Sequence, residues 1–212
     1  MWVRGAAIRP VPRYAVVDAA TLDQIEKGLA DESAEARSEL DGAFARFEAT
    51  QPELSDALSL VLSRPLDETA LALGYFLSIA VWLSFERTFG APRLREVSAD
   101  ALRATEEAIK LEVELRAAHG DEPLDLDDVV SIEQPNVLAF IHDHVDAALE
   151  PRAALAGAGG EGGEADDAAD AREVDADDVD TVYRAVVLLT LCLSHAVLPV
   201  DGAARGTREL MA

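Results

Sequence analysis

The amino-acid sequence predicts an all-α fold, a helical bundle of about six to seven helices. Three observations support this fold class: apolar residues recur at helical spacing along most of the chain, helix starts are marked by proline, serine or aspartate, and alternating strand patterns are nearly absent. Half of the 212 residues are hydrophobic, which is enough for one substantial core. We therefore expect a single all-helical domain over residues 18–200.

The individual helices are predicted from their starts and their apolar faces. Pro52 and Pro135 stand at the first turn of a helix, where the missing N–H of proline would have had no partner. Asp67, Ser98 and Asp177 place side-chain oxygens at helix N-termini, where they satisfy free N–H groups. In chain order, the predicted helices span residues 21–29, 33–49, 52–63, 67–89, 98–118, 135–149 and 178–197.

The short and the long helices differ in how their apolar residues are arranged. Residues 52–63 and 135–149 carry one apolar stripe each, so each of these helices buries one face. Residues 70–85 and 185–200 are apolar all round, over a length of roughly 24 Å, against the about 30 Å of hydrocarbon in a membrane. Because their flanks are acidic, we expect two central core helices and no membrane span.

Two Gln-Pro steps open similar pairs of helices. Gln51 and Gln134 each precede a short amphipathic helix and then a long apolar one, and a long charged helix comes before each pair. Placing Ser84 over Ser194 aligns the two long helices. This order predicts two related three-helix units. The predicted units are residues 31–90 and 98–198. Two unrelated helix pairs with ordinary proline starts are the alternative.

The remaining segments are expected to be poorly ordered. Residues 151–177 are dominated by Gly, Ala, Asp and Glu, so they cannot bury enough apolar surface to offset their ordering entropy, and we expect a disordered acidic insert. Residues 201–212 are expected to form a flexible tail. Residues 1–17 form a basic N-terminal arm that is either loosely ordered or folded over acidic surface of the same chain or of a second copy.

The charge balance limits the classes of partner. The chain carries 41 acidic and 18 basic side chains, a formal net charge of -23, and it remains acidic without the insert. An acidic body repels phosphate backbones at long range, so we expect no nucleic-acid partner. The single cysteine, Cys192, gives no disulfide framework, and a cytoplasmic location is expected.

A His-Asp pair provides the candidate for catalysis. His142 and Asp143 are adjacent on a predicted helix, with His119 earlier in the chain and Asp180 later. This set resembles the metal-binding residues of HD-domain phosphohydrolases, which are also all-helical. The resemblance implies a metal-dependent enzyme in which these four residues hold metal ions that activate water against a phosphate. Helix geometry favours a surface dipeptide instead, since Asp143 points away from the apolar stripe.

Charged residues within apolar faces are the second candidate site. Glu86 lies in the last turn of the all-apolar helix with Arg87 beside it, and Glu112 and Arg116 project from a wide apolar arc. Charges placed in this way need partners. We expect the four residues to form a buried ionic cluster that fixes helix packing, or to line a polar pocket with a function.

By elimination, the expected function is that of a non-catalytic helical interaction or regulatory protein. Its partner would be an unidentified protein, and the chain could also form a homodimer through the basic arm or an exposed apolar surface. No cofactor and no metal are expected for this function. The two alternatives are the metal-dependent phosphohydrolase and a role in which the acidic insert competes for a basic surface on a partner.

Overall fold

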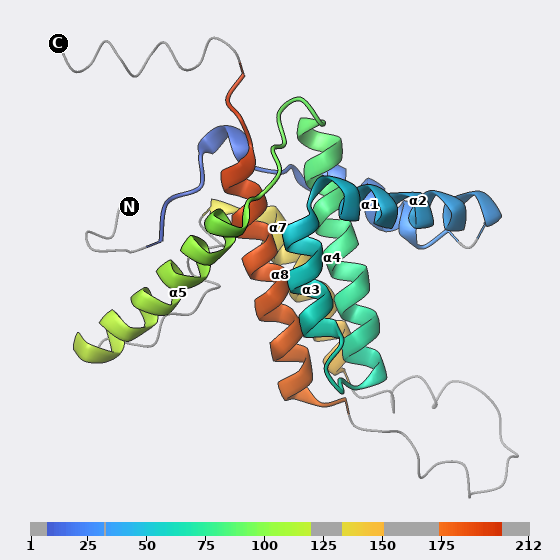
Figure 1. The fold of residues 1–212 in the computed structure, drawn as a ribbon. Coiled ribbons are helices and arrows are strands. Elements are labelled where there is room, and N and C mark those ends of the chain that lie inside the picture. Colours follow the sequence, from blue (N-terminus) through green and yellow to red (C-terminus); the bar gives the residue numbers. More distant parts are fainter. Residues whose placement is uncertain (1–7, 32, 120–132, 151–173, 201–212) are drawn as a thin grey trace, which may run out of the picture.

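The computed structural model describes residues 8–31, 33–119, 133–150 and 174–200. The side chains not described within these ranges are those of Glu35, Glu112, Val113 and residues 115–119. In the described ranges the chain forms seven α-helices and a short 3-10 turn, and no β-strand (Figure 1). The predicted all-α fold is confirmed.

Every helix in the described ranges begins and ends within two residues of its predicted bounds. The elements are η1 (Arg13–Ala15), α1 (Ala19–Leu29), α2 (Ala34–Thr50), α3 (Pro52–Leu62), α4 (Glu68–Phe89), α5 (Ala99–His119), α7 (Pro135–Leu149) and α8 (Ala176–Ala196). Side-chain caps account for several starts. Asp18, Ser33 and Asp67 each accept a hydrogen bond from the backbone N–H three residues further on, which satisfies a donor without an intrahelical partner.

The helices α4 and α8 lie side by side at the centre of the bundle and run parallel (Figure 1). Their N-termini meet at one end of the molecule. There the Asp67 N–H donates to the Asp178 carboxylate at 2.8 Å, and the Asp175 N–H donates to the Asp67 carboxylate at 3.3 Å. Trp82 and Leu191 are among the side chains that the pair buries almost completely. The expected pair of central apolar helices is therefore found.

Two helices of the described part, Glu68–Phe89 and Ala176–Ala196, are long and apolar enough to cross a membrane by length and composition. These helices are longer than the apolar stretches predicted from the sequence, because each begins with a polar first turn. In the fold, 67% and 56% of their apolar windows are buried. Core helices of soluble proteins meet the same criterion, so length and composition are only a weak indication of a membrane.

Two buried glutamines with the same backbone conformation begin α3 and α7. Gln51 has φ -137° and ψ 56°, and Gln134 has φ -136° and ψ 62°. Their relative exposures are 1% and 0%. Gln51 Nε2 donates to the carbonyl of Arg95 at 3.0 Å, and its Oε1 accepts from the N–H of Val97 at 2.9 Å. One carboxamide therefore satisfies two backbone groups of an extended segment.

Gln134 repeats this pattern on a different segment. Its Nε2 donates to the carbonyl of Ala15 at 2.6 Å, and its Oε1 accepts from the N–H of Val17 at 3.2 Å. Nε2 also donates to Ser194 Oγ at 2.8 Å, which completes its donors. We call these two arrangements the glutamine clamps. Each joins an amide side chain to the carbonyl of one residue and to the N–H two residues later.

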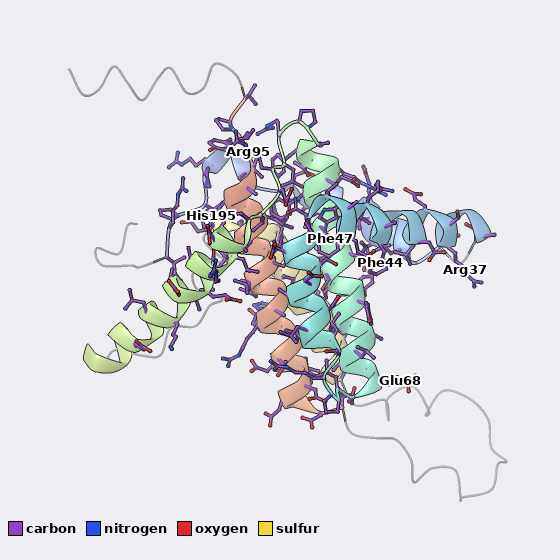
Figure 2. All side chains as sticks on the ribbon, viewed as in Figure 1. Arg37, Phe44, Phe47, Glu68, Arg95 and His195 are labelled. Atoms are coloured by element: carbon purple, nitrogen blue, oxygen red, sulfur yellow. The ribbon has the colours of Figure 1, made fainter. Side chains whose placement is uncertain are left out.

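The glutamine clamps tie the two halves of the chain to each other. The segment held by Gln134 leads into α1, and the segment held by Gln51 leads into α5. Each glutamine thus comes from one half and holds the segment that begins the other half. Figure 2 shows Arg95 near the end of the bundle opposite to Glu68, so the clamps and the Asp67 contacts stabilise opposite ends.

Residues 8–17 of the predicted basic arm pack onto the bundle. Val11, Ala15 and Val17 belong to the buried core. The Val11 N–H donates to the Glu133 carboxylate at 2.7 Å, so this segment is held through its backbone and apolar side chains. The rest of the predicted arm lies outside the described residues, as do residues 151–173 of the predicted insert and the predicted tail 201–212.

Removing a clamp should destabilise the fold. Gln134→Ala leaves the Ala15 carbonyl and the Val17 N–H buried without their partner, and we expect the free energy of unfolding to fall by about 2–4 kcal/mol. Chemical denaturation followed by circular dichroism measures this change. The control is Gln24→Ala, an exposed position on α1 expected to stay within about 0.5 kcal/mol of the parent. Equal stabilities of the two variants would show that the clamp contributes nothing.

Candidate functional site

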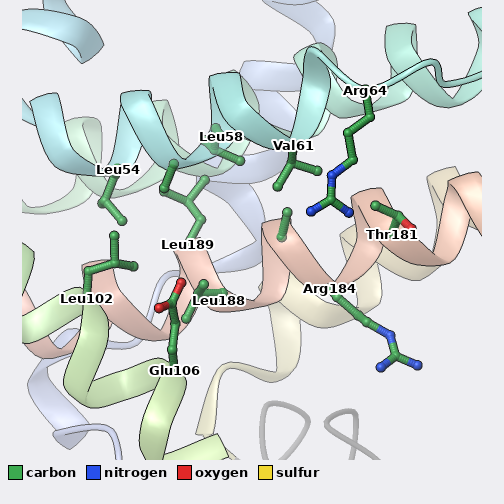
Figure 3. Close-up of a pocket in the computed structure, with 12 residues that line it drawn as sticks. Leu54, Leu58, Val61, Arg64, Leu102, Glu106, Thr181, Arg184, Leu188 and Leu189 are labelled. Atoms are coloured by element: carbon green, nitrogen blue, oxygen red, sulfur yellow. The ribbon is translucent and has the colours of Figure 1, made fainter. Parts of the chain in front are cut away.

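An open groove of about 290 Å³ lies between α3, α5 and α8 (Figure 3). Its walls are mainly apolar. The apolar lining residues are Leu54, Ala57, Leu58 and Val61 from α3, Leu102 from α5, and Ala185, Leu188 and Leu189 from α8. The groove exists because α5 leans away from the bundle, so its far end does not cover α3 and α8 (Figure 1).

Charged side chains stand at separate places along this groove. Figure 3 shows the Glu106 carboxylate projecting toward Leu188, whereas the Arg64 guanidinium lies beside Thr181 at the opposite end. Arg184 points away from α3, and its Nε donates to Asp180 at 2.8 Å. The groove therefore offers one carboxylate and one guanidinium to an occupant, separated by apolar wall.

The central helices can be compared position by position through their burial. Moving the predicted alignment by one residue pairs buried positions of α4 with buried positions of α8. The matched pairs are Ala70 with Val179, Leu73 with Val182, Leu77 with Val186, and Val81 with Thr190. The serine alignment would instead have placed buried Ala70 over Asp180, which is exposed. These pairs favour a register one residue away from the predicted alignment.

The groove can be compared with the space enclosed by α1, α4 and α7, which we call its counterpart. We pair α3 with α7 through the two clamp glutamines, and α5 with α1 because both begin directly after a clamped segment. This pairing differs from the predicted units, in which the helix of residues 33–49, which is α2, was the match of α5. Five positions then match. They are Ala57 with Phe140, Val61 with His144, Ala185 with Phe76, Leu102 with Leu22, and Glu106 with Glu26.

Aromatic rings fill the counterpart. The rings of Phe76 and Phe140 are stacked with centroids 6.1 Å apart. The His144 ring lies 4.8 Å from Phe76 and 4.4 Å from Phe140, measured between centroids. His144 Nε2 is 3.4 Å from the Glu26 carboxylate, so an acidic side chain of α1 contacts an imidazole of α7. Where these rings stand, the groove has only alanine and valine.

The predicted metal ligands are not brought together. His142 Nε2 lies 3.2 Å from Tyr183 Oη, Asp143 is exposed, and Asp180 accepts from Arg184. The side chain of His119 lies outside the described residues. Among the side chains that the structure describes, no group of three or more His, Cys, Asp or Glu could hold a metal ion. The phosphohydrolase alternative stays a prediction.

Two residues of the predicted ionic cluster, Glu86 and Arg87, pair with residues of α2. Glu86 accepts two hydrogen bonds from Arg46 of α2, both at 3.0 Å, and Arg46 also lies over the Trp82 ring. Arg87 instead lies 3.4 Å from Glu39. These pairs are partly exposed, since the Glu86 and Arg87 side chains are 27% and 39% accessible. The predicted partners Glu112 and Arg116 lie among the side chains not described.

Burial shifts the pKa values of two residues of α8, Cys192 and His195. Burial raises the pKa of the Cys192 thiol to about 11, although a hydrogen bond with Thr105 acts to lower it. Burial lowers the pKa of His195, whose Nε2 donates to the carbonyl of Arg9 at 2.9 Å. Each of the two side chains thus contacts a different segment. Cys192 contacts Thr105 of α5, so its reactivity reports whether α5 stays in place.

Comparisons of the chain with protein-family models, with curated proteins and with solved structures give no match. The groove must therefore be interpreted from its own residues. Sequence reasoning placed Ala57 on an apolar stripe and treated that stripe as core. The sequence held one signal that the groove is open, namely the alignment of the two Gln-Pro helices. That alignment sets the small side chain of Ala57 over the ring of Phe140.

The groove and its counterpart should respond oppositely to changes of volume. Phe140→Ala removes a buried ring, and we expect the free energy of unfolding to fall by about 3 kcal/mol. Ala57→Phe places a ring in open space, and we expect a gain of about 1 kcal/mol. Thermal and chemical denaturation measure both.

The control for this pair of variants is Ala80→Phe at a fully buried position of α4. Overpacking there is expected to cost about 1–3 kcal/mol. If Ala57→Phe destabilised the protein as much as Ala80→Phe, the groove would not be open.

Cys192 should resist alkylation in the folded protein. Because the thiolate is the reactive form, a thiol with a pKa of about 11 at pH 8 is expected to react at least about 100-fold more slowly than in the unfolded chain. Mass spectrometry after iodoacetamide treatment, with and without denaturant, measures the two rates. Similar rates would mean that α5 and α8 separate readily in solution.

Proposed function

We propose that the protein is a non-catalytic binding protein whose groove between α3, α5 and α8 receives an amphipathic helix of a partner protein. The observation that carries this proposal is the groove itself, an open apolar surface flanked by charges. Its counterpart in the same molecule is closed by aromatic side chains, so an occupant of the groove would complete a packing arrangement that this fold already uses.

The dimensions of the groove suit a short helix. Its lining residues on α3 run from Leu54 to Val61, which corresponds to about 11 Å at 1.5 Å per residue, and Arg64 follows just beyond the end of α3. A helix of two to three turns covers this length with apolar anchors at positions i, i+3 or i+4, and i+7. The apolar stripe of α3 has the same spacing, so two helices can interdigitate their side chains along the groove.

The charges favour a partner helix with charged residues on both sides of its apolar face. An acidic side chain would lie near Arg64 and a basic one near Glu106. At longer range the formal net charge of -23 attracts partners that are basic overall and accelerates their encounter with the chain. The partner we propose is therefore a basic protein with an amphipathic helix.

We further infer that the two halves of the chain are related units. The glutamine clamps support this, because two carboxamides with matching backbone angles hold segments of the same kind in opposite halves. The shared burial pattern of α4 and α8 supports it as well. Under this interpretation each unit carries a ring at one of the matched positions, Phe76 on α4 and Phe140 on α7, and a small side chain at the other, Ala57 on α3 and Ala185 on α8.

Peptide selection tests the proposed function. A phage-displayed library of random 16-residue peptides is selected on the full-length protein, and enriched peptides are measured by fluorescence anisotropy. We expect binders with helical spacing of apolar residues whose affinity falls at least about tenfold with Ala57→Phe, because the new ring occupies the groove.

The matched control is Ala139→Phe, the same substitution at an exposed position of α7 away from the groove. It should leave peptide affinity unchanged. Binders that tolerate Ala57→Phe as well as Ala139→Phe would place recognition elsewhere and refute the groove as the binding site.

A further inference from the structure

The side chains that fill the counterpart indicate which chemical groups would fill the groove. Resting on the proposed function, we propose that the partner helix inserts an aromatic ring between Ala57 and Ala185 and directs a basic group to Glu106. The partner would thus supply in trans the groups that Phe76, Phe140 and His144 supply within the chain.

The aromatic part of this proposal follows from volume. Ala57 and Ala185 occupy the positions that Phe140 and Phe76 occupy in the counterpart, so both rings of the stacked pair are missing from the groove. The groove measures about 290 Å³. A cavity of roughly 150 Å³ holds a benzene ring, so one ring fits with room for its flanking atoms. Leu54, Leu58 and Leu189 then provide the apolar contacts around it.

The basic part follows from Glu106. Its match in the counterpart, Glu26, is 3.4 Å from the imidazole of His144. The position on α3 that matches His144 is Val61, which has no polar group to offer a carboxylate. Glu106 therefore projects over apolar wall, where a cation from the occupant would be stabilised by charge and by a hydrogen bond.

The spacing of the two groups follows from α7. Phe140 and His144 are one turn apart on the same helix face, at positions i and i+4. A partner helix that carries an aromatic residue and a Lys, Arg or His four positions away presents the same pair. The spacing distinguishes this occupant from an aliphatic helix and from an anionic amphiphile held only by Arg64.

Small probes test the chemistry without knowledge of the partner. The full-length protein, with ¹³C-labelled Leu and Val methyl groups, is titrated at 0.15 M salt with 2-phenylethylamine, benzyl alcohol, n-hexylamine and 3-phenylpropionate. We expect 2-phenylethylamine to shift the methyl signals of Leu58, Val61 and Leu188 at concentrations about fivefold lower than any other probe, because only it carries both the ring and the cation. The methyl signals of Leu22 and Val137 in the filled counterpart should not move.

Two variants separate the ring from the charge. Glu106→Gln should reduce the affinity for 2-phenylethylamine to that for benzyl alcohol, and leave benzyl alcohol unchanged. Ala57→Phe should abolish both, and Ala185→Phe serves the same purpose if the first variant does not fold.

The outcomes distinguish this inference from the proposed function. If n-hexylamine or 3-phenylpropionate binds the groove as tightly as 2-phenylethylamine, the aromatic and basic assignment is overturned while the groove remains a binding site. If selected peptides depend on the groove but lack an aromatic residue with a basic residue four positions away, the inference again fails alone. If no probe shifts the groove methyls and no selected peptide responds to Ala57→Phe, both the inference and the proposed function fail.

Discussion

The arrangement of this bundle depends on two buried carboxamides that must be satisfied where water cannot reach them. Leaving one such group unpaired in the core costs about 1–3 kcal/mol, so each clamp requires an extended segment of the chain to stay in contact. Gln134 holds the segment before α1, and Gln51 holds the segment before α5. The direction in which α1 and α5 leave the centre of the molecule is therefore set by hydrogen bonds between these carboxamides and the backbone at the helix starts.

The clamps fix where α1 and α5 begin. Beyond these starts the two helices differ in the side chains that lie beneath them. α1 packs on α4 and α7 over the stacked rings of Phe76 and Phe140, with His144 reaching Glu26. α5 carries the matching acid, Glu106, but the positions matched to the rings hold Ala57, Val61 and Ala185. Since packing energy falls steeply with lost contacts, an unfilled space next to a helix persists most easily where it is open to solvent. An open groove can thus stand where small residues take the place of rings within a similar packing arrangement.

The fold was largely predictable because its signals are local. Prolines at first turns and capping oxygens act within one turn, so the bounds of the described helices agree with the sequence to two residues. The clamps were not predictable, because the Gln51 carboxamide finds its partners 44 and 46 residues further on. The same holds for Glu86, whose partner Arg46 lies 40 residues earlier on another helix. A charge on an apolar face shows that a partner is needed but not which one.

The sequence did not indicate the groove on α8 because the predicted alignment of α4 with α8 was one residue away from the alignment that burial favours. A shift of one residue turns a helical position by about 100°, so the serine alignment moved every side chain of α8 to a different face. In that alignment Phe76 lies over buried Val186, so Ala185 of the groove is not set over a ring. The burial pattern restores the match to Ala185. An internal comparison becomes informative about function only when the register is set by packing, because packing decides which side chains share a space.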